Sequence, residues 1–310
     1  MANTIEYASI IQTELDKAAK ETATSGWMEL NDDLVKYNSG SEVKIPKLDM
    51  DGLGNYDRQD GFVDGDVDLT WQTKSLTQDR GRRFTFDENE VNDTNFVLTA
   101  STVMGEFQNK KVVPEIDAYR YSSIAAGAIT RDHAAGGYIP AEATILSQLY
   151  YDIAAVQDVV GDDTPLVITM SIPVAAMFDL NDKLSRSVSV TEFEQGELKL
   201  KVKALNGQHP IIRVGSGRMK TSYLFRDGAT AGQTMGGFAP AEDAKDVNWI
   251  ICPRRAPIAV SRTDKMRIFD PETYQGKRAW AMDYRKFHDL WMLDQSWDSV
   301  KVNIKQELNG

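Results

Sequence analysis

The chain has 310 residues, of which 42% are hydrophobic and 26% are charged, so it is long enough to bury a sizeable core in about two domains. Its net charge of −11 argues against a protein that recognises nucleic acid through a basic surface. It does not argue against a surface that lies next to DNA without binding it, because like charges repel. The single cysteine, Cys252, excludes an internal disulfide framework and a thiolate zinc site, and its apolar neighbours predict a buried side chain.

Two further classes are disfavoured by the hydropathy pattern. No apolar run approaches the roughly 20 residues that cross a bilayer. The N-terminal sequence MANTIEYASI lacks the basic and apolar regions of a signal peptide. We therefore expect a protein that is made in the cytoplasm of its host cell and has no membrane partner.

The first 40 residues are predicted to reach outward. Tyr7, Ile11 and Leu15 recur at four-residue spacing, which predicts one apolar helix face within residues 4–22. The remainder, residues 25–40, is rich in Gly and Asn and shows no periodicity. We expect an N-terminal arm with few partners in its own chain.

Residues 41–90 are predicted to form a long two-stranded hairpin with almost no core. Its centre, residues 49–68, contains seven Asp and four Gly, and the β-type runs 43–45, 69–71 and 83–86 flank it. A lone hairpin is marginally stable in water, and so long a polar loop is usually functional or disordered. A second subunit is the natural partner, so the hairpin indicates assembly.

Five side chains of this hairpin are candidate intersubunit contacts, because aromatic groups on a coreless arm need a partner surface. Packing of the aromatic rings across the hairpin itself is an equally good alternative. The candidates are Trp71, Arg82, Arg83, Phe84 and Phe86.

A helical middle follows. Met104 and Phe107 belong to an apolar stripe that predicts a helix over residues 94–112. Pro114 is expected to end or kink it, and a second helix then runs to Ala128.

A third helix and a strand-rich part complete the chain. The helix is expected to start at Pro140, to bury a stripe that includes Ile145, Leu149 and Ile153, and to end at Gly161. Strands are predicted at 166–170, 198–203, 211–214, 249–252, 258–260, 267–269, 278–284, 287–293 and 300–304, with a helix at 173–184. The predicted fold class is α+β.

No catalytic, cofactor-binding or metal-binding residue is predicted. His133, His209 and His288 lie far apart and show no ligand or triad spacing. Residues 215–221 differ from a phosphate-binding loop, which needs glycine where Met219 stands, so we predict a turn with a basic surface.

The acidic hairpin contains half of a calcium loop. Asp49 and Asp51 match, but Leu53 occupies a position that needs an oxygen ligand, and Asp60 is shorter than the usual glutamate. A solvated loop is the default interpretation, and cation binding stays open.

Three stretches together resemble the major capsid proteins of tailed double-stranded DNA bacteriophages. They are residues 82–124 (RRFTFDENEV…), residues 204–219 (ALNGQHPIIRVGSGRM) and residues 249–294 (WIICPRRAPI…). The resemblance extends over nearly the whole chain and rests on the order of these stretches.

The resemblance implies a division of the chain. An N-terminal arm (1–40) precedes an extended hairpin loop, or E-loop (41–90). A peripheral (P) domain with a spine helix comprises 91–164 and 276–310, and an axial (A) domain comprises 165–275.

The resemblance also implies a structural protein and no enzyme. Pentamers and hexamers would build an icosahedral shell around packaged double-stranded DNA, in a virion that is assembled in the host cytoplasm. A separate scaffold protein, a portal and a decoration protein are the expected partners, and no cofactor is expected. Pro114 and the hairpin base are plausible hinges for expansion of the shell.

Three other functions compete with this one. A nanocompartment shell of the same fold would enclose enzymes. A metal-dependent hydrolase would use the acidic residues as its site. A self-associating phage tail or neck protein would share the assembly but not the shell.

Overall fold

The computed structural model describes residues 22–34, 36–37, 42–56, 58–59, 61–87, 102–181, 188–195, 198–263, 267–269, 272, 274, 276 and 279–308. Nearly all of the helix predicted at 4–22, and the first part of the one predicted at 94–112, lie outside these residues.

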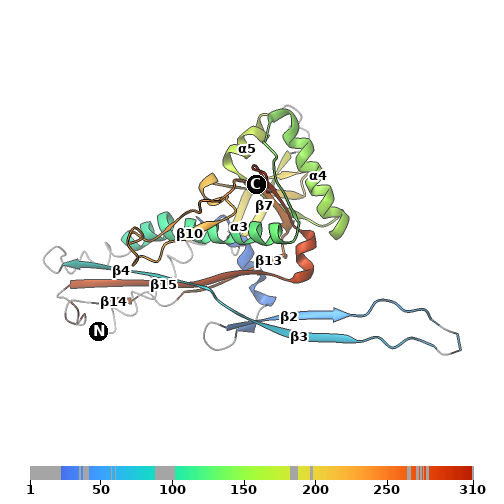
Figure 1. Cartoon of the computed structure of the whole chain (residues 1–310), viewed down its shortest axis with the longest axis horizontal. Coiled ribbons are helices and arrows are strands. Elements are labelled where there is room, and N and C mark those ends of the chain that lie inside the picture. Colours follow the sequence, from blue (N-terminus) through green and yellow to red (C-terminus); the bar gives the residue numbers. More distant parts are fainter. Residues whose placement is uncertain are drawn as a thin grey trace.

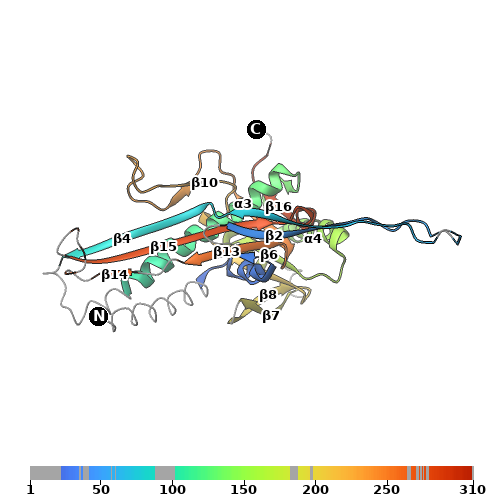
Figure 2. The same cartoon turned by 90° about the horizontal axis from the view of Figure 1, so that it is seen from below.

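The molecule is elongated, with a triangular head at its centre (Figure 1). A long helix, α3 (Val113–Thr130), runs beneath the head. A long strand, β15 (Ala279–Met292), runs below α3 and extends to one side. The hairpin of β2 (Glu42–Met50) and β3 (Val67–Ser75) projects to the opposite side, and both views show it standing well clear of the head (Figures 1 and 2).

A seven-stranded mixed sheet forms the framework of the head. Its strand order is β5-β16-β12-β6-β9-β8-β7. The strands are β5 (Ala134–Ala135), β6 (Leu166–Ser171), β7 (Val188–Gln195), β8 (Leu198–Leu205), β9 (His209–Val214), β12 (Val247–Pro253) and β16 (Lys301–Ile304). β6 and β9 are parallel, as are β16 and β5, whereas the other neighbours are antiparallel.

The central strands of the head are covered on both faces. Every residue of β6 is buried, as a nearly continuous apolar run predicts. On one face, β6 packs with α4 (Glu142–Val160) and α5 (Ile172–Asp179) in one hydrophobic cluster. A second cluster on the opposite side joins the sheet to α3.

The helix predictions are largely confirmed. Ile145, Leu149 and Ile153 are buried on α4, which starts two residues after Pro140 and ends where the backbone of Gly161 adopts a φ of 90°. α5 is shorter than the helix predicted at 173–184.

The helix does not end at Pro114, which was one of the two outcomes predicted there. Residues 102–107 are α-helical, and a π-helical turn, Gln108–Val112, leads directly into α3. Val112 and Val113 keep right-handed helical dihedral angles. The Val113 N–H donates to the Gln108 carbonyl five residues earlier, and Pro114 lies in the first turn of α3, where proline is tolerated, so the helix continues.

The long sheet below α3 differs from the prediction in two ways. The strands predicted at 278–284 and 287–293 are one continuous strand, β15. β4 (Gln78–Asp87) does not belong to the hairpin, because it pairs along its whole length with β15. β13 (Pro257–Thr263) and β14 (Arg267–Phe269) pair with β15 on its other edge.

Residues 22–34 also correct the prediction. They contain a 3₁₀ helix, η1 (Gly26–Leu34), and Trp27 and Met28 are fully buried in the cluster that joins the head to α3. This part of the N-terminal segment therefore has many partners in its own chain.

Small elements complete the described part of the chain. They are β1 (Lys36–Tyr37), β10 (Tyr223–Phe225), β11 (Phe238–Pro240), η5 (Ser216–Arg218) and η6 (Asp294–Ser299). Among the described residues, no helix combines the length and the apolar character needed to cross a membrane.

Candidate assembly surfaces

The hairpin is anchored at its root by apolar side chains. Val43 and Ile45 of β2 and Leu76, just after β3, are buried against Ile258 and Val260 of β13. The strands continue in register from Glu42 opposite Ser75 to Met50 opposite Val67. The base of the hairpin is therefore part of the folded core.

Beyond its root, β3 is exposed on both faces. All of its residues except the partly buried Gln72 are exposed. A sheet ordinarily buries at least one face against another layer. Since the outer hairpin lacks this layer among the described residues, a partner surface is needed to complete it.

The outer hairpin carries an unusual number of exposed apolar side chains. Leu53 is fully exposed and Phe62 is 87% exposed. The other apolar side chains exposed in the same region are Met50, Tyr56, Val63, Val67, Leu69 and Trp71. An apolar surface of this extent marks an interaction site in a soluble protein.

The tip of the hairpin has some structure of its own. The rings of Tyr56 and Phe62 pack with their centroids 4.9 Å apart. The Asp66 backbone N–H donates to the Asp51 carboxylate over 3.0 Å, and the Asp51 N–H donates to the Asp66 carbonyl over 3.2 Å. In the part of the chain that the structure describes, which excludes Asp60, no group of three His, Cys, Asp or Glu side chains is arranged to hold a metal.

The five candidate contacts occupy two different regions. Trp71 lies on the hairpin, 40% exposed, with the Lys36 ammonium 4.4 Å from the centre of its ring. Arg82, Arg83, Phe84 and Phe86 lie on β4 instead.

The β4 candidates all have partners in their own chain. Phe84 packs against Phe107 with ring centroids 5.0 Å apart, and Phe86 belongs to the same cluster. Arg83 makes a two-pronged pair with Asp283, with Nη2 donating over 2.6 Å. Arg82 donates to the Thr234 carbonyl over 3.3 Å. Their intersubunit role stays a prediction.

Sequence reasoning named only Trp71 from the exposed apolar set. Leu53 and Phe62 were not predicted, because each lies among Gly and Asp residues and outside the β-type runs that mark strands. The signal was present, because apolar residues between such loop formers have no core of their own to join.

A polar joint connects the N-terminal segment to α3. The buried Asp117 carboxylate accepts hydrogen bonds from the backbone N–H and hydroxyl of both Thr24 and Ser25, at 2.6–3.2 Å. Arg218 donates to it over 3.0 Å. One turn further, the buried Arg120 donates to Glu29 over 2.6 Å. These bonds fix the course of the chain just before the hairpin.

The three histidines do not form a common site. His133 is half-buried, with Nε2 3.4 Å from Asp298. His209 is buried, and its Nδ1 accepts a hydrogen bond from the Leu166 N–H. His288 is buried next to the Tyr119 ring, with centroids 5.2 Å apart, and its Nδ1 has no hydrogen-bond partner among the described residues.

Two further sequence predictions are confirmed. Cys252 is buried, and burial raises the pKa of its thiol to about 12. Residues 216–218 form a turn, η5, although Arg218 serves the buried Asp117 as well as the surface.

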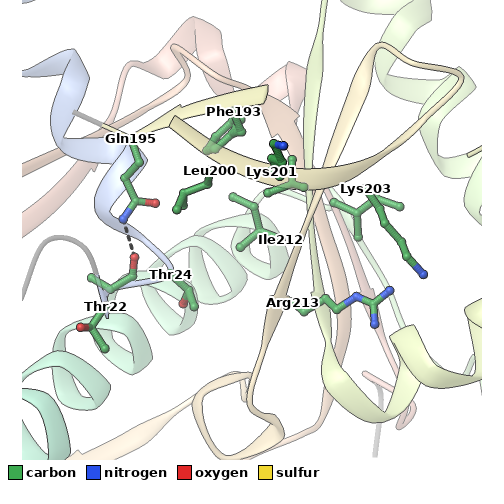
Figure 3. Close-up of a pocket in the computed structure, with 12 residues that line it drawn as sticks. Thr22, Thr24, Phe193, Gln195, Leu200, Lys201, Lys203, Ile212 and Arg213 are labelled. Atoms are coloured by element: carbon green, nitrogen blue, oxygen red, sulfur yellow. Dashed lines mark hydrogen bonds between the residues drawn. The ribbon is translucent and has the colours of Figure 1, made fainter. Parts of the chain in front are cut away.

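One pocket of about 340 Å³ lies between residues 22–24 and strands β7 to β9 (Figure 3). Phe193, Leu200 and Ile212 supply its apolar wall, and Lys203 and Arg213 lie on the other side. No carboxylate, histidine or cysteine side chain is among the described residues that line it. It is therefore best described as a gap left where residues 22–24 pack against the sheet.

No protein-family model and no curated protein matches the chain. Several solved structures, however, match the chain. The capsid of cyanophage P-SCSP1u matches with a TM-score of 0.54 and 8% identity, over 87% of this chain and 84% of that chain. The mature capsid of bacteriophage PhiM1 matches with a TM-score of 0.51 and 9% identity, over 86% and 82%. A virus-like particle from Pyrococcus furiosus matches with a TM-score of 0.50 and 10% identity, over 94% and 97%.

At sequence identities of 8–10%, these matches show a shared fold and nothing further. The chain has the α+β fold of tailed-phage major capsid proteins, which confirms the resemblance seen in the sequence.

Proposed function

We propose that this chain is a major capsid protein that self-assembles as pentamers and hexamers into an icosahedral shell around packaged double-stranded DNA. The observation that carries the proposal is the outer β2–β3 hairpin, which exposes Leu53, Phe62 and their apolar neighbours on a coreless projection. A second copy of the chain is the partner that a shell supplies at every such hairpin. The fold shared with phage capsids supports the same role.

The division of labour follows the elements. In the proposed division, residues 41–90 form the E-loop, which includes the projecting β2–β3 hairpin. Residues 165–275 form the A domain around the axis of each ring, and residues 91–164 and 276–310 form the P domain. Each contact would join unlike surfaces of two copies, and such contacts close into rings when the rotation between copies allows it.

The net charge of −11 suits a shell that encloses DNA without gripping it. A separate scaffold protein, a portal and a decoration protein complete the proposed assembly, which takes place in the host cytoplasm and ends in the virion. The chain then acts as a structural protein and not as an enzyme.

A nanocompartment shell of the same fold is the second candidate. The match to the virus-like particle from Pyrococcus furiosus covers 94% of this chain and 97% of that chain, and a shared fold is compatible with either kind of shell. The cargo separates the two functions, since a phage shell encloses nucleic acid and a nanocompartment encloses protein.

The test is electron microscopy and light scattering of the purified full-length chain and of two variants. The wild type is expected to form shells, tubes, sheets or rings. The double variant Leu53→Ser/Phe62→Ser is expected to remain unassembled with an unchanged urea midpoint, because both side chains are exposed in the free chain. Met235→Ser, which alters an 85% exposed residue outside the hairpin, serves as the matched control.

A wild type that stays monomeric, even with its scaffold partner, would sink the assembly function. Assembly by the double variant at the wild-type concentration would show that the hairpin is not the contact.

A further inference from the structure

Every residue of helix α5 is apolar except Asp179 at its C-terminal end. Its buried face consists of Val174, Ala175 and Phe178, which pack in the core of the head. Its opposite face is equally apolar. The exposed side chains there are Ile172, Pro173, Ala176 and Met177 of the helix and Leu180 at its C-terminal end. A helix on the surface of a soluble protein normally turns a polar face outward, so this one is built to be covered on both sides.

This exposure does not come from a loosely held helix. Phe178 is almost completely buried, and the Asn181 side chain donates to the Glu142 carbonyl over 2.6 Å, which ties the end of α5 to the start of α4. The helix is therefore fixed, and Ile172 and Leu180 remain 52% and 65% exposed.

Among the described residues, the charged groups beside the exposed face are one carboxylate and two cations, so they do not add to the negative charge of the chain. Asp179 is the only charged residue of α5, and Lys203 Nζ and Arg213 Nη2 donate to it over 2.9 and 2.7 Å. Although partial burial raises the pKa of Asp179, these hydrogen bonds and charges hold it below its ordinary value, so the carboxylate stays ionised and compensated. On a chain with a net charge of −11, most surfaces of two copies repel each other, and this face does not.

We propose that the face formed by Ile172, Ala176, Met177 and Leu180 binds a second copy of this chain, in a contact separate from that of the hairpin. The proposal rests on the proposed shell function and adds to it. Figure 1 shows α5 high on the head, far from the β2–β3 hairpin. A subunit with adhesive surfaces at two distant places can bind neighbours in two directions, as a closed shell requires.

Thiol labelling tests the contact directly. Cys252 is 2% exposed, so the wild-type chain gives little background. Met177→Cys places a thiol on the α5 face, and Val159→Cys places one at a comparably exposed position of α4. Each full-length variant is labelled with a maleimide before and after assembly. Met177→Cys is expected to react about tenfold more slowly after assembly, because the contact must open first, while Val159→Cys is expected to change little.

The outcomes separate this proposal from the shell function. Equal labelling of Met177→Cys before and after assembly would overturn the α5 contact and leave the shell function standing. Equal protection of both thiols would also overturn it, because it would report enclosure instead of contact. If the wild-type chain never assembles, both the proposed shell function and the proposed α5 contact are contradicted.

A second variant pair gives an independent readout. Met177→Asp/Leu180→Asp places two carboxylates on the α5 face and is expected to prevent assembly without moving the urea midpoint of the free chain. Val159→Asp/Asp163→Ala keeps the net charge unchanged on another exposed part of the head and is expected to assemble. Normal assembly by the α5 variant would overturn the contact.

Discussion

Residues 22–34 and the β2–β3 hairpin are neighbours in the chain, and each contains a tryptophan, but their surroundings differ completely. Trp27 is fully buried and meets Phe193 edge-on, with ring centroids 6.5 Å apart. Trp71 is 40% exposed, and the cation of Lys36 lies over its ring. The first segment completes the fold of its own chain, whereas the second leaves its apolar surface for another.

The difference arises from the partners that each segment finds. Thr24 and Ser25 donate to the buried carboxylate of Asp117, and Glu29 accepts from the buried guanidinium of Arg120, so these polar groups find partners inside the protein. Among the residues that the structure describes, the hairpin has buried partners at its root alone, through Val43 and Ile45. Free energy gained by burying the outer hairpin is therefore available for assembly.

The largest expected effect on folding comes from Trp27. Trp27→Ala removes a fully buried ring and is expected to lower the free energy of unfolding by about 3–5 kcal/mol, as measured by urea unfolding of the unassembled chain. Trp71→Ala is the matched control and is expected to change it by less than about 1 kcal/mol, the usual range for exposed sites. Equal losses at both positions would refute the contrast between the two segments.

Asp117 is expected to have the next largest effect. Asp117→Ala leaves the donors of Thr24, Ser25 and Arg218 without their acceptor, and the free energy of unfolding is expected to fall by about 3 kcal/mol. The loss is expected to be no larger than this because Arg218 is partly exposed, so its freed guanidinium can form hydrogen bonds with water. Asp163→Ala, at an exposed position, is the control. A loss below about 1 kcal/mol would show that the joint is not what holds residues 22–34.

The sequence predicts those parts of the fold that local patterns determine. Buried runs such as 166–170 and 249–252 identify central strands, and the stripe of Ile145, Leu149 and Ile153 identifies α4. Seven Asp and four Gly identify the hairpin tip. In each case the signal lies within one short window.

The remaining features depend on contacts between distant residues. β4 pairs with β15, a strand about two hundred positions away in the sequence. Because β4 directly follows the hairpin strands in the sequence, the sequence alone predicted it as part of the hairpin. The charged Arg285 interrupts the apolar pattern of β15, but it is paired across the strands with Asp79, over 2.7 Å, so the strand continues. Trp27 lies in a window without periodicity, and only its tertiary partners reveal it as core.

His288 of β15, which contacts Tyr119 of α3, is expected to make the free energy of unfolding depend on pH. Burial is the main cause that lowers the pKa of His288 well below its ordinary value, and the nearby cations Arg120, Lys286 and Arg80 add to it, while Glu29 opposes it. In the unfolded chain the imidazole titrates near pH ~6.5. Above this pH both states are neutral. As the pH falls below it, the unfolded chain binds a proton that the folded chain does not, so stability decreases.

The expected loss is about 1 kcal/mol between about pH 7 and about pH 5.5, before most carboxylates titrate. Urea midpoints of the wild type and of His288→Gln across this range measure it. His209, whose pKa burial also lowers, keeps part of the pH dependence in the variant. A variant with the full wild-type slope would show that His288 does not contribute.

Arg83 provides the smallest expected effect on folding and the sharpest test of a contact. Its pair with Asp283 is solvent-exposed, and exposed ion pairs add little to stability, so Arg83→Ala is expected to leave the urea midpoint of the free chain unchanged. Light scattering of the same variant then isolates assembly. Impaired assembly with an unchanged midpoint would support an intersubunit role for Arg83 on β4. If both are unchanged, the Arg83 side chain is needed neither for the fold nor for assembly, and its predicted intersubunit role is wrong.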